Sequence, residues 1–159
     1  MANWLFKEEP ECYNFEQLER DGSTVWSGVA NNLARKNLRQ VCKGDRVLFY
    51  ATGKVKAVVG EMEVIEGPRP ESDGADPRSV VVTVRPVRRL QSEVTLASIK
   101  ADPQLADWDL VRLSRLSVMS VSAGQWQRIM HMSQGKEAAK ITRRTGPPKS
   151  PRPARKNKE

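Results

Sequence analysis

The sequence of 159 residues has no long apolar run, since hydrophobic residues make up 38% of it and the mean hydropathy is −0.58. No segment approaches the roughly 18 apolar residues that a membrane-spanning helix needs, which excludes a membrane protein. The opening segment, MANWLFKEEP, becomes acidic where a secretory signal would be basic and then apolar. We therefore expect an intracellular protein, cytoplasmic in a bacterium or nuclear in a eukaryote.

Cysteine and histidine are scarce. Cys12 and Cys42 lie 30 residues apart, which gives neither a disulfide framework nor the paired spacing of a zinc site, and we expect two reduced thiols. The single histidine, His131, has no Ser, Cys or Asp at a fixed local spacing, so we expect a surface or packing role. Because the motifs HExxH, GxSxG, GxGxxG and the P-loop are absent, the sequence predicts no metal, no cofactor and no catalytic residue.

Positive charge is concentrated toward the C-terminus. The formal net charge is +8, and residues 133–159 carry nine basic and two acidic side chains, which leaves +1 for residues 1–132. The segment TGPPKSPRPARKNKE holds four of the ten prolines and no large apolar residue, so it cannot bury enough surface to offset chain entropy. We predict a domain at 1–132 and a basic, Pro-rich tail at 133–159, disordered from about Arg143 onward.

A basic tail on a nearly neutral domain favours a nucleic-acid partner. Lys and Arg release condensed counterions from phosphates and bind them without sequence preference. A solubility tail is the alternative, although solubility is served slightly better by acidic residues. The predicted phosphate-binding residues are Arg35, Arg39, Lys140, Arg143 and Arg144.

Strand-like apolar runs are interspersed with short amphipathic helices. Asn14, Thr95 and Ser122 are typical helix caps, and Gly22 and Gly44 are typical helix ends. Pro86 predicts an edge or a bulge in its strand. The pattern predicts an α+β fold with a small mixed sheet or partly closed barrel. The expected strands are 3–6, 45–52, 55–67, 79–90 and 113–121, the expected helices are 15–20, 31–43, 95–102 and 122–132, and a loop covers 68–79.

Trp26 is the strongest candidate for a binding residue. The segment VWSGV places its ring beside Gly28 in irregular chain, where backbone can approach a ligand and the ring offers a flat face. Trp4 and Trp126 lie in strand and helix patterns, where core packing is the better interpretation. Asn31 stands at a helix start, where capping is the plain role and a hydrogen bond to a base edge is the alternative.

Four blocks of the sequence resemble the EVE domain, a member of the PUA-like superfamily that includes thymocyte nuclear protein and is related by fold to the YTH reader of methylated adenine. The resemblance spans about Asn3 to Met132, in matching order and spacing. Its blocks are WLFKEEP, VWSGVANNLARKNLR, GDRVLFY and SRLSVMSVSAGQW.

The resemblance implies a PUA-like mixed β-barrel flanked by short helices, with a pocket for an extruded and often modified base. Carried over by position, the residues of this base-binding pocket are Lys7, Trp26, Val29, Asn31, Tyr50, Arg115, Leu116, Ser117 and Val118. The sequence departs from the family pattern at several positions near the pocket, which leaves the identity of the base open. These departures are Glu8, Ala30, Asn32, Leu33, Ala51, Met119 and Ser120.

Our leading hypothesis is a non-enzymatic module that recognises a modified, flipped-out base in DNA or RNA, monomeric and without a membrane partner. A second hypothesis is a nucleic-acid-processing or base-modifying enzyme that uses Lys7, Glu8 and Glu9 for acid–base work, although charged residues at a strand end are usually just solvated. A third is a pocket for a small metabolite. The sequence does not distinguish DNA from RNA.

Overall fold

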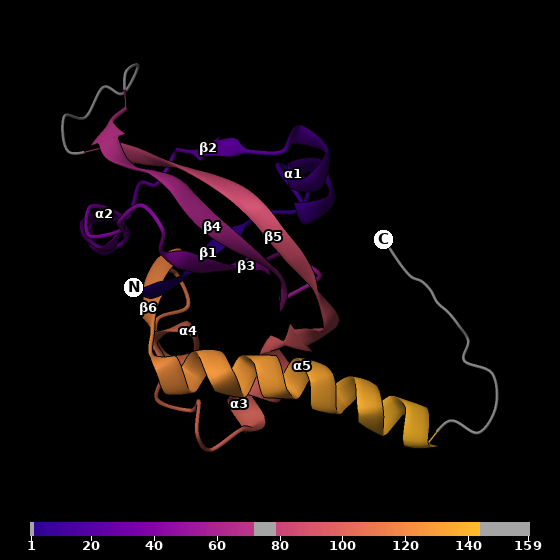
Figure 1. Ribbon diagram of the computed structural model, residues 1–159. Coiled ribbons are helices and arrows are strands. Elements are labelled where there is room, and N and C mark those ends of the chain that lie inside the picture. Colours follow the sequence, from indigo (N-terminus) through magenta and orange to yellow (C-terminus); the bar gives the residue numbers. More distant parts are fainter. Residues whose placement is uncertain (1, 72–78, 144–159) are drawn as a thin grey trace.

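Within the part of the chain that the computed structural model describes, residues 2–71 and 79–143, six strands form one mixed sheet in the order β2-β5-β4-β3-β1-β6 (Figure 1). For residues 135–143 the description covers the backbone alone. The strands are β1 (Asn3–Glu8), β2 (Thr24–Trp26), β3 (Arg46–Ala51), β4 (Ala57–Pro70), β5 (Val80–Thr95) and β6 (Val118–Val121). The predicted α+β class is confirmed.

The sheet is rolled rather than flat. Neighbouring strands lie about 4.8 Å apart, so a flat sheet would hold β1 and β2, four steps apart in the strand order, at roughly 19 Å. In the structure the ring of Phe6 on β1 lies 5.3 Å, centroid to centroid, from the ring of Trp26 on β2. Contact across this distance requires the sheet to curl back on itself, which agrees with the expected partly closed barrel.

Strand β1 lies inside the sheet and is apolar for that reason. It pairs in parallel with β3, where Leu5 is opposite Leu48, and antiparallel with β6, where Leu5 is opposite Met119. A strand covered on both faces becomes a continuous apolar run, and Trp4, Leu5 and Phe6 are all buried. The charged residues Lys7 and Glu8 come where this coverage ends.

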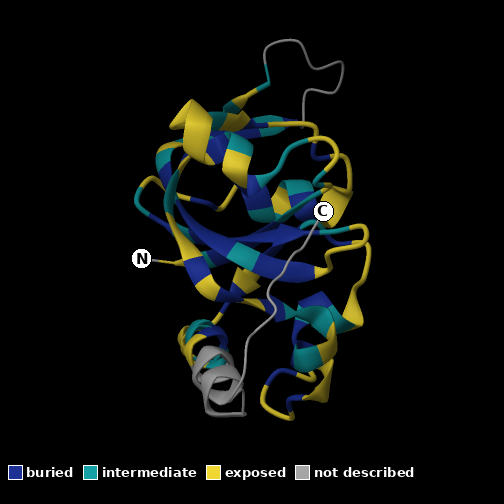
Figure 2. Ribbon diagram, turned by 90° about the vertical axis from the view of Figure 1, so that its right-hand side faces the viewer, coloured by how far each residue is buried: buried dark blue, intermediate teal, exposed yellow. Residues whose placement is uncertain are grey.

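Five helices cover the sheet within the described residues: α1 (Phe15–Asp21), α2 (Asn32–Leu38), α3 (Leu96–Ala101), α4 (Asp109–Arg112) and α5 (Ala123–Arg143). Helices α3, α4 and α5 gather at one side of the barrel, away from α1 and α2 (Figure 1). Figure 2 shows buried residues concentrated on the strands and exposed ones on the outer helix faces. No helix of the described residues is long and apolar enough to cross a membrane.

Several helix caps follow the sequence signals. Asn14 and Gln17 form a reciprocal capping box at α1, which ends at Gly22 with φ +82°. The hydroxyl of Thr95 accepts from the backbone N–H at the start of α3. The hydroxyl of Ser122 accepts likewise at α5, at 3.1 Å. Each cap satisfies a backbone donor that the helix cannot satisfy itself, so these local predictions are confirmed.

Several predicted boundaries are wrong. The segment around Trp26, expected as irregular chain, is strand β2, because Trp26 and Thr24 pair with Val82 and Val84 of β5. Helix α2 ends at Leu38 rather than near Gly44. Tight i→i+3 bonds follow it, such as the one from the Val41 N–H to the Leu38 carbonyl, and they turn Val41 into the core.

Pro86 lies at an irregularity, as predicted, because the β4–β5 register shifts between Glu61 and Met62 and Met62 is the residue opposite Pro86. Strand β4 continues to Pro70, into the expected loop. The rest of that loop, 72–78, and the tail residues 144–159 lie outside the described residues.

Helix α5 continues past residue 132 and packs on β5. The hydroxyl of Ser133, a residue 2% exposed, donates to the Ser92 carbonyl at 2.9 Å and accepts from the Ser92 N–H at 3.1 Å. Arg128 on the same helix donates to Asp102 at 2.6 Å. The division of the chain at residue 132 stays a prediction, but Ser133 itself makes buried contacts with the sheet.

Asp45 connects the start of β1 to the start of β3. Its buried carboxylate accepts from the Trp4 indole N–H at 2.9 Å, the Ala2 N–H at 3.1 Å and the Cys42 N–H at 2.8 Å. A buried carboxylate is tolerated when several donors satisfy it. Trp4 is therefore a core residue, as expected. Cys12 and Cys42 are both exposed and unbridged.

Gly60 on β4 yields a prediction about core packing. A Cβ added there would overlap the ring of Phe15, so Gly60→Ala should lower the free energy of unfolding by about 1–3 kcal/mol. Gly67→Ala on the same strand is the matched control, because the nearest atom to its Cβ would be the Lys43 nitrogen at 3.8 Å. Chemical denaturation measures both. Equal stabilities of the two variants would contradict the packing described for Phe15.

Candidate functional site

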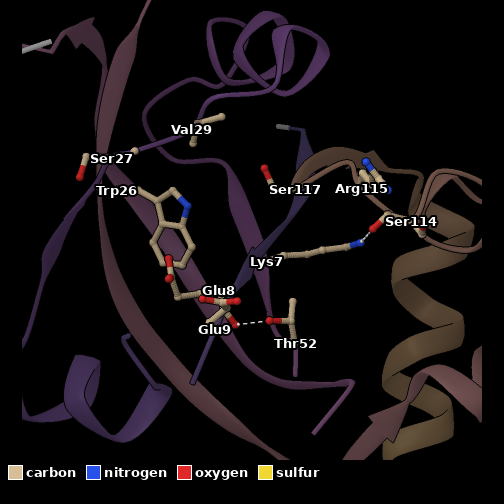
Figure 3. Close-up of a pocket in the computed structure, with 11 residues that line it drawn as sticks. Lys7, Glu8, Glu9, Trp26, Ser27, Val29, Thr52, Ser114, Arg115 and Ser117 are labelled. Carbon is tan, nitrogen blue, oxygen red and sulfur yellow. Dashed lines mark hydrogen bonds between the residues drawn. The ribbon is translucent and has the colours of Figure 1, made fainter. Parts of the chain in front are cut away.

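A hollow of about 320 Å³ opens at the end of β1, close to the smallest size typical of ligand pockets. Its residues come from the end of β1, from the segment 26–29, from the turn after β3 and from the loop before β6. Figure 3 shows the Lys7 side chain extending from the side of Trp26 toward Ser114 and Arg115. The central hollow, as we call it, is lined by Lys7, Glu8, Glu9, Trp26, Ser27, Gly28, Val29, Thr52, Ser114, Arg115 and Ser117.

Trp26 belongs both to the core and to the wall of this hollow. Its ring packs against Phe6 at 5.3 Å and edge-on against Phe49 at 5.6 Å, and the residue is only 4% exposed. It nevertheless lines both the central hollow and a second opening of about 280 Å³. The indole is therefore held in place by core packing, and only a small part of the residue is accessible to a ligand.

The backbone beside Trp26 is bare. Gly28 has φ +76°, a conformation that favours glycine, and no heavy atom lies within 4 Å of the position a Cβ would take. The glycine is needed for the turn, and it also leaves peptide groups uncovered at the wall of the hollow. Val29, 8% exposed, adds an apolar contact next to it.

Lys7 crosses the floor of the hollow. Its ammonium donates to the Ser114 carbonyl at 2.9 Å and lies 5.6 Å from the centre of the Tyr50 ring. Partial burial lowers the pKa of Lys7, and burial raises the pKa of Tyr50. Tyr50 does not line the hollow, and its contact with the site is the one between its ring and the Lys7 ammonium.

Two carboxylates, those of Glu8 and Glu9, lie on the same side of the hollow as Trp26. Burial raises the pKa of Glu8, the negative charge of Glu9 adds to this effect, and a backbone hydrogen bond from Glu9 opposes it. Figure 3 shows both glutamates grouped next to the indole. This side of the hollow is acidic, and among the described residues no group of three or more His, Cys, Asp or Glu side chains could hold a metal ion.

The loop before β6 forms the opposite wall. Ser117 is tied to β1, because its carbonyl accepts from the Lys7 N–H at 2.9 Å. Arg115 is exposed, and its guanidinium makes no hydrogen bond or ion pair with the described residues. Leu116 and Val118 are buried, and the Val118 carbonyl accepts from the Asn37 side chain on α2 at 2.8 Å. Val118 is thus a core residue outside the central hollow.

Asn31 and Leu116 line an adjoining hollow rather than the central one. The Asn31 side-chain oxygen accepts from the Ala34 N–H at 3.0 Å, so the residue is the N-cap of α2. The structure therefore assigns the capping role to Asn31. Of the nine predicted pocket residues, five meet at the central hollow: Lys7, Trp26, Val29, Arg115 and Ser117.

The predicted phosphate-binding residues do not line the central hollow where they are described. Arg35 donates to the Val29 carbonyl at 3.0 Å, which supports the turn after Trp26, and Arg39 is the C-cap of α2. Lys140 and Arg143 lie on α5, and Arg144 lies outside the described residues. Their role stays a prediction.

Ser27, Thr52 and Ser114 also line the hollow, although no sequence motif indicated them. Ser27 and Ser114 are next to predicted residues, so proximity along the chain could have found them. Thr52 has no such signal. It reaches the hollow because β1 and β3 pair in parallel with Glu8 opposite Ala51, which is a long-range contact.

The sequence and the fold both match those of known proteins. The family model described as "EVE domain" matches residues 2–132. The NMR structure of Rpa0253 from Rhodopseudomonas palustris is 34% identical, with a TM-score of 0.80 over 84% of this chain and 94% of the other. The human THYN1 protein in complex with 5-methylcytosine-containing DNA is 23% identical, with a TM-score of 0.79 over 84% of this chain and 98% of the other.

A more distant structure shares the fold. The YTH domain of Zygosaccharomyces rouxii MRB1, in complex with N6-methyladenosine RNA, is 18% identical, with a TM-score of 0.51 over 84% of this chain and 86% of the other. The α+β fold with its rolled sheet is thus of the PUA-like type that the resemblance implied. Since the family model covers most of the sequence, this chain belongs to the EVE domain family.

Proposed function

We propose that this EVE domain binds nucleic acid and takes a single modified base into the central hollow, against Trp26. The observation that carries the proposal is the opening beside a rigidly packed indole, next to the bare backbone at Gly28. Two proteins of the same fold support it, since human THYN1 was solved with 5-methylcytosine-containing DNA and the YTH domain with N6-methyladenosine RNA.

Polar contacts must supply most of the net binding free energy. Extruding a base from a stack costs a few kcal/mol, and stacking on an aromatic ring returns about 1–3 kcal/mol. Trp26 is almost fully buried, so a ligand contacts little of the ring and the return lies at the low end. Net affinity then comes from phosphate contacts and from hydrogen bonds to the base edge.

Selectivity for a methylated base needs more than the methyl group itself. A buried methyl contributes about 0.8 kcal/mol, which is near fourfold in affinity. A stronger preference requires polar groups that stay unpaired when the wrong base is bound. The groups in position to do this are the peptide groups around Gly28, the hydroxyl of Ser117 and the carboxylate of Glu8.

Replacing Trp26 tests the proposed wall. Trp26→Phe keeps an aromatic ring against Phe6 and Phe49 but makes the wall of the hollow smaller, so affinity for an oligonucleotide with one 5-methylcytosine or N6-methyladenine should fall about two- to fivefold. The loss should be smaller for the unmodified oligonucleotide. Fluorescence anisotropy at a temperature where thermal melts show the variant folded measures both.

Trp126→Phe is the matched control for this substitution. Trp126 is partly buried on α5 and lines none of the hollows described for the site. The affinities of the Trp126→Phe variant for both oligonucleotides should equal those of the unaltered chain. Equal losses for modified and plain oligonucleotides in Trp26→Phe would defeat the base-reading model.

The tail is tested by truncation after Arg143. A cut at residue 132 would remove Ser133 and its buried bonds to Ser92, whereas a cut after Arg143 removes six basic residues and leaves α5 intact. If the tail contacts phosphates, the slope of log affinity against log salt should flatten by about 0.7 for each single-strand phosphate released. An unchanged slope assigns the tail no part in binding.

An enzymatic role in the same hollow is favoured by one observation, the lowered pKa of Lys7 beside the raised pKa of Glu8. Paired groups shifted toward neutrality are typical of acid–base sites. Incubating the protein with end-labelled DNA and RNA and Mg²⁺ tests this role, because cleavage or a mass change that is lost in Glu8→Gln would establish turnover. Thermal stabilisation by free nucleosides, without oligonucleotide binding, would instead support a metabolite pocket.

A further inference from the structure

A hollow of about 290 Å³ adjoins the central one and shares two of its residues. We call it the flanking hollow, and it is lined by Asn31, Leu33, Leu113, Ser114, Arg115 and Leu116. Ser114 and Arg115 also line the central hollow. The two spaces therefore adjoin at one short loop segment, and a ligand longer than a single base can reach both.

The flanking hollow has an exposed apolar surface. Leu33 is 43% exposed and Leu113 is 37% exposed, and the buried Leu116 lines the same hollow. Single exposed leucines are ordinary on protein surfaces, but here two from separate helices, α2 and the end of α4, face one space. Such a surface can pack against the flat face of any of the bases.

Arg115 lies at the boundary of the two hollows. Its guanidinium is exposed and has no partner among the described residues, so it is available to a phosphate. The other end of the central hollow holds Glu8 and Glu9, and Glu8 also lines the second opening beside Trp26. A polyanion with one base in the central hollow is repelled there and attracted at Arg115.

We propose that the flanking hollow holds the neighbouring nucleotide of the same strand, its base against Leu33 and Leu113 and the connecting phosphate on Arg115. The inference rests on the proposed function, and it adds that the domain binds two consecutive nucleotides and that the strand leaves on the Arg115 side. Asn31 uses its side-chain oxygen to cap α2, which leaves its amide nitrogen as a donor for the sugar or base edge.

The decisive comparison uses trinucleotides and the full chain. The probes are d(T-m5C-T) and U-m6A-U, each beside a version whose flanking nucleotides lack their bases. Titration calorimetry should show the complete trinucleotide bound about three- to tenfold more tightly than its abasic partner. Leu33→Ser and Leu113→Ser should remove this difference, because they remove the apolar surface while keeping every phosphate contact.

Val55→Ser is the matched control, since Val55 is 38% exposed and lines none of the three hollows. This variant should keep the full difference in affinity between the complete and the abasic-flanked trinucleotide. Arg115→Gln should weaken complete and abasic-flanked trinucleotides by the same factor and reduce the salt slope by about 0.7, as expected for one phosphate contact on a single strand.

The other outcomes separate the two proposals. If complete and abasic-flanked trinucleotides bind equally to the unaltered protein, the flanking subsite is wrong and the base-reading function stands. If neither binds, both proposals fail. If the leucine variants turn a dimer into a monomer by light scattering and leave nucleotide binding unchanged, the flanking hollow is an interface between two copies and the subsite is wrong.

Discussion

The contact of Trp26 with Phe6 and Phe49 is the interaction on which the core and the site both depend. The three rings come from β2, β1 and β3, and they meet because the sheet rolls until strands four steps apart face each other. The same contact closes one side of the core and fixes one wall of the hollow. A wall held by core packing is already in place before a ligand arrives, which reduces the ordering cost of binding.

Acidic and basic side chains lie on opposite sides of the site, and the net positive charge of the chain is concentrated toward its C-terminus. The carboxylates of Glu8 and Glu9 lie beside Trp26, whereas Arg115 lies at the far side of the central hollow. Lys7 is held between these sides by the Ser114 carbonyl, so it organises the loop before β6 as well as contributing charge. With residues 1–132 near neutrality, the domain itself has limited attraction for a polyanion, and residues 133–159 carry most of the net positive charge.

Local features were predictable because they depend on neighbours in the sequence. The caps at Asn14, Thr95 and Ser122 satisfy helix ends within three residues, and the apolar run of β1 follows from its burial. Strand β2 was missed because its three residues are too few to show a pattern and are strand only by pairing with β5. The end of α2 was missed because Val41 turns into the core after the helix has stopped.

The sequence by itself determined the family, the α+β class and the importance of Trp26, since motif blocks, periodicity and turn chemistry are all carried by residues close together in the chain. The tertiary structure decided which residues share the hollow. Thr52 joins it through the parallel pairing of β1 with β3, Tyr50 contacts Lys7 without lining the hollow, and Asn31 caps a helix at the edge of a second hollow. These positions depend on long-range strand pairing and on the roll of the sheet, which no local pattern encodes.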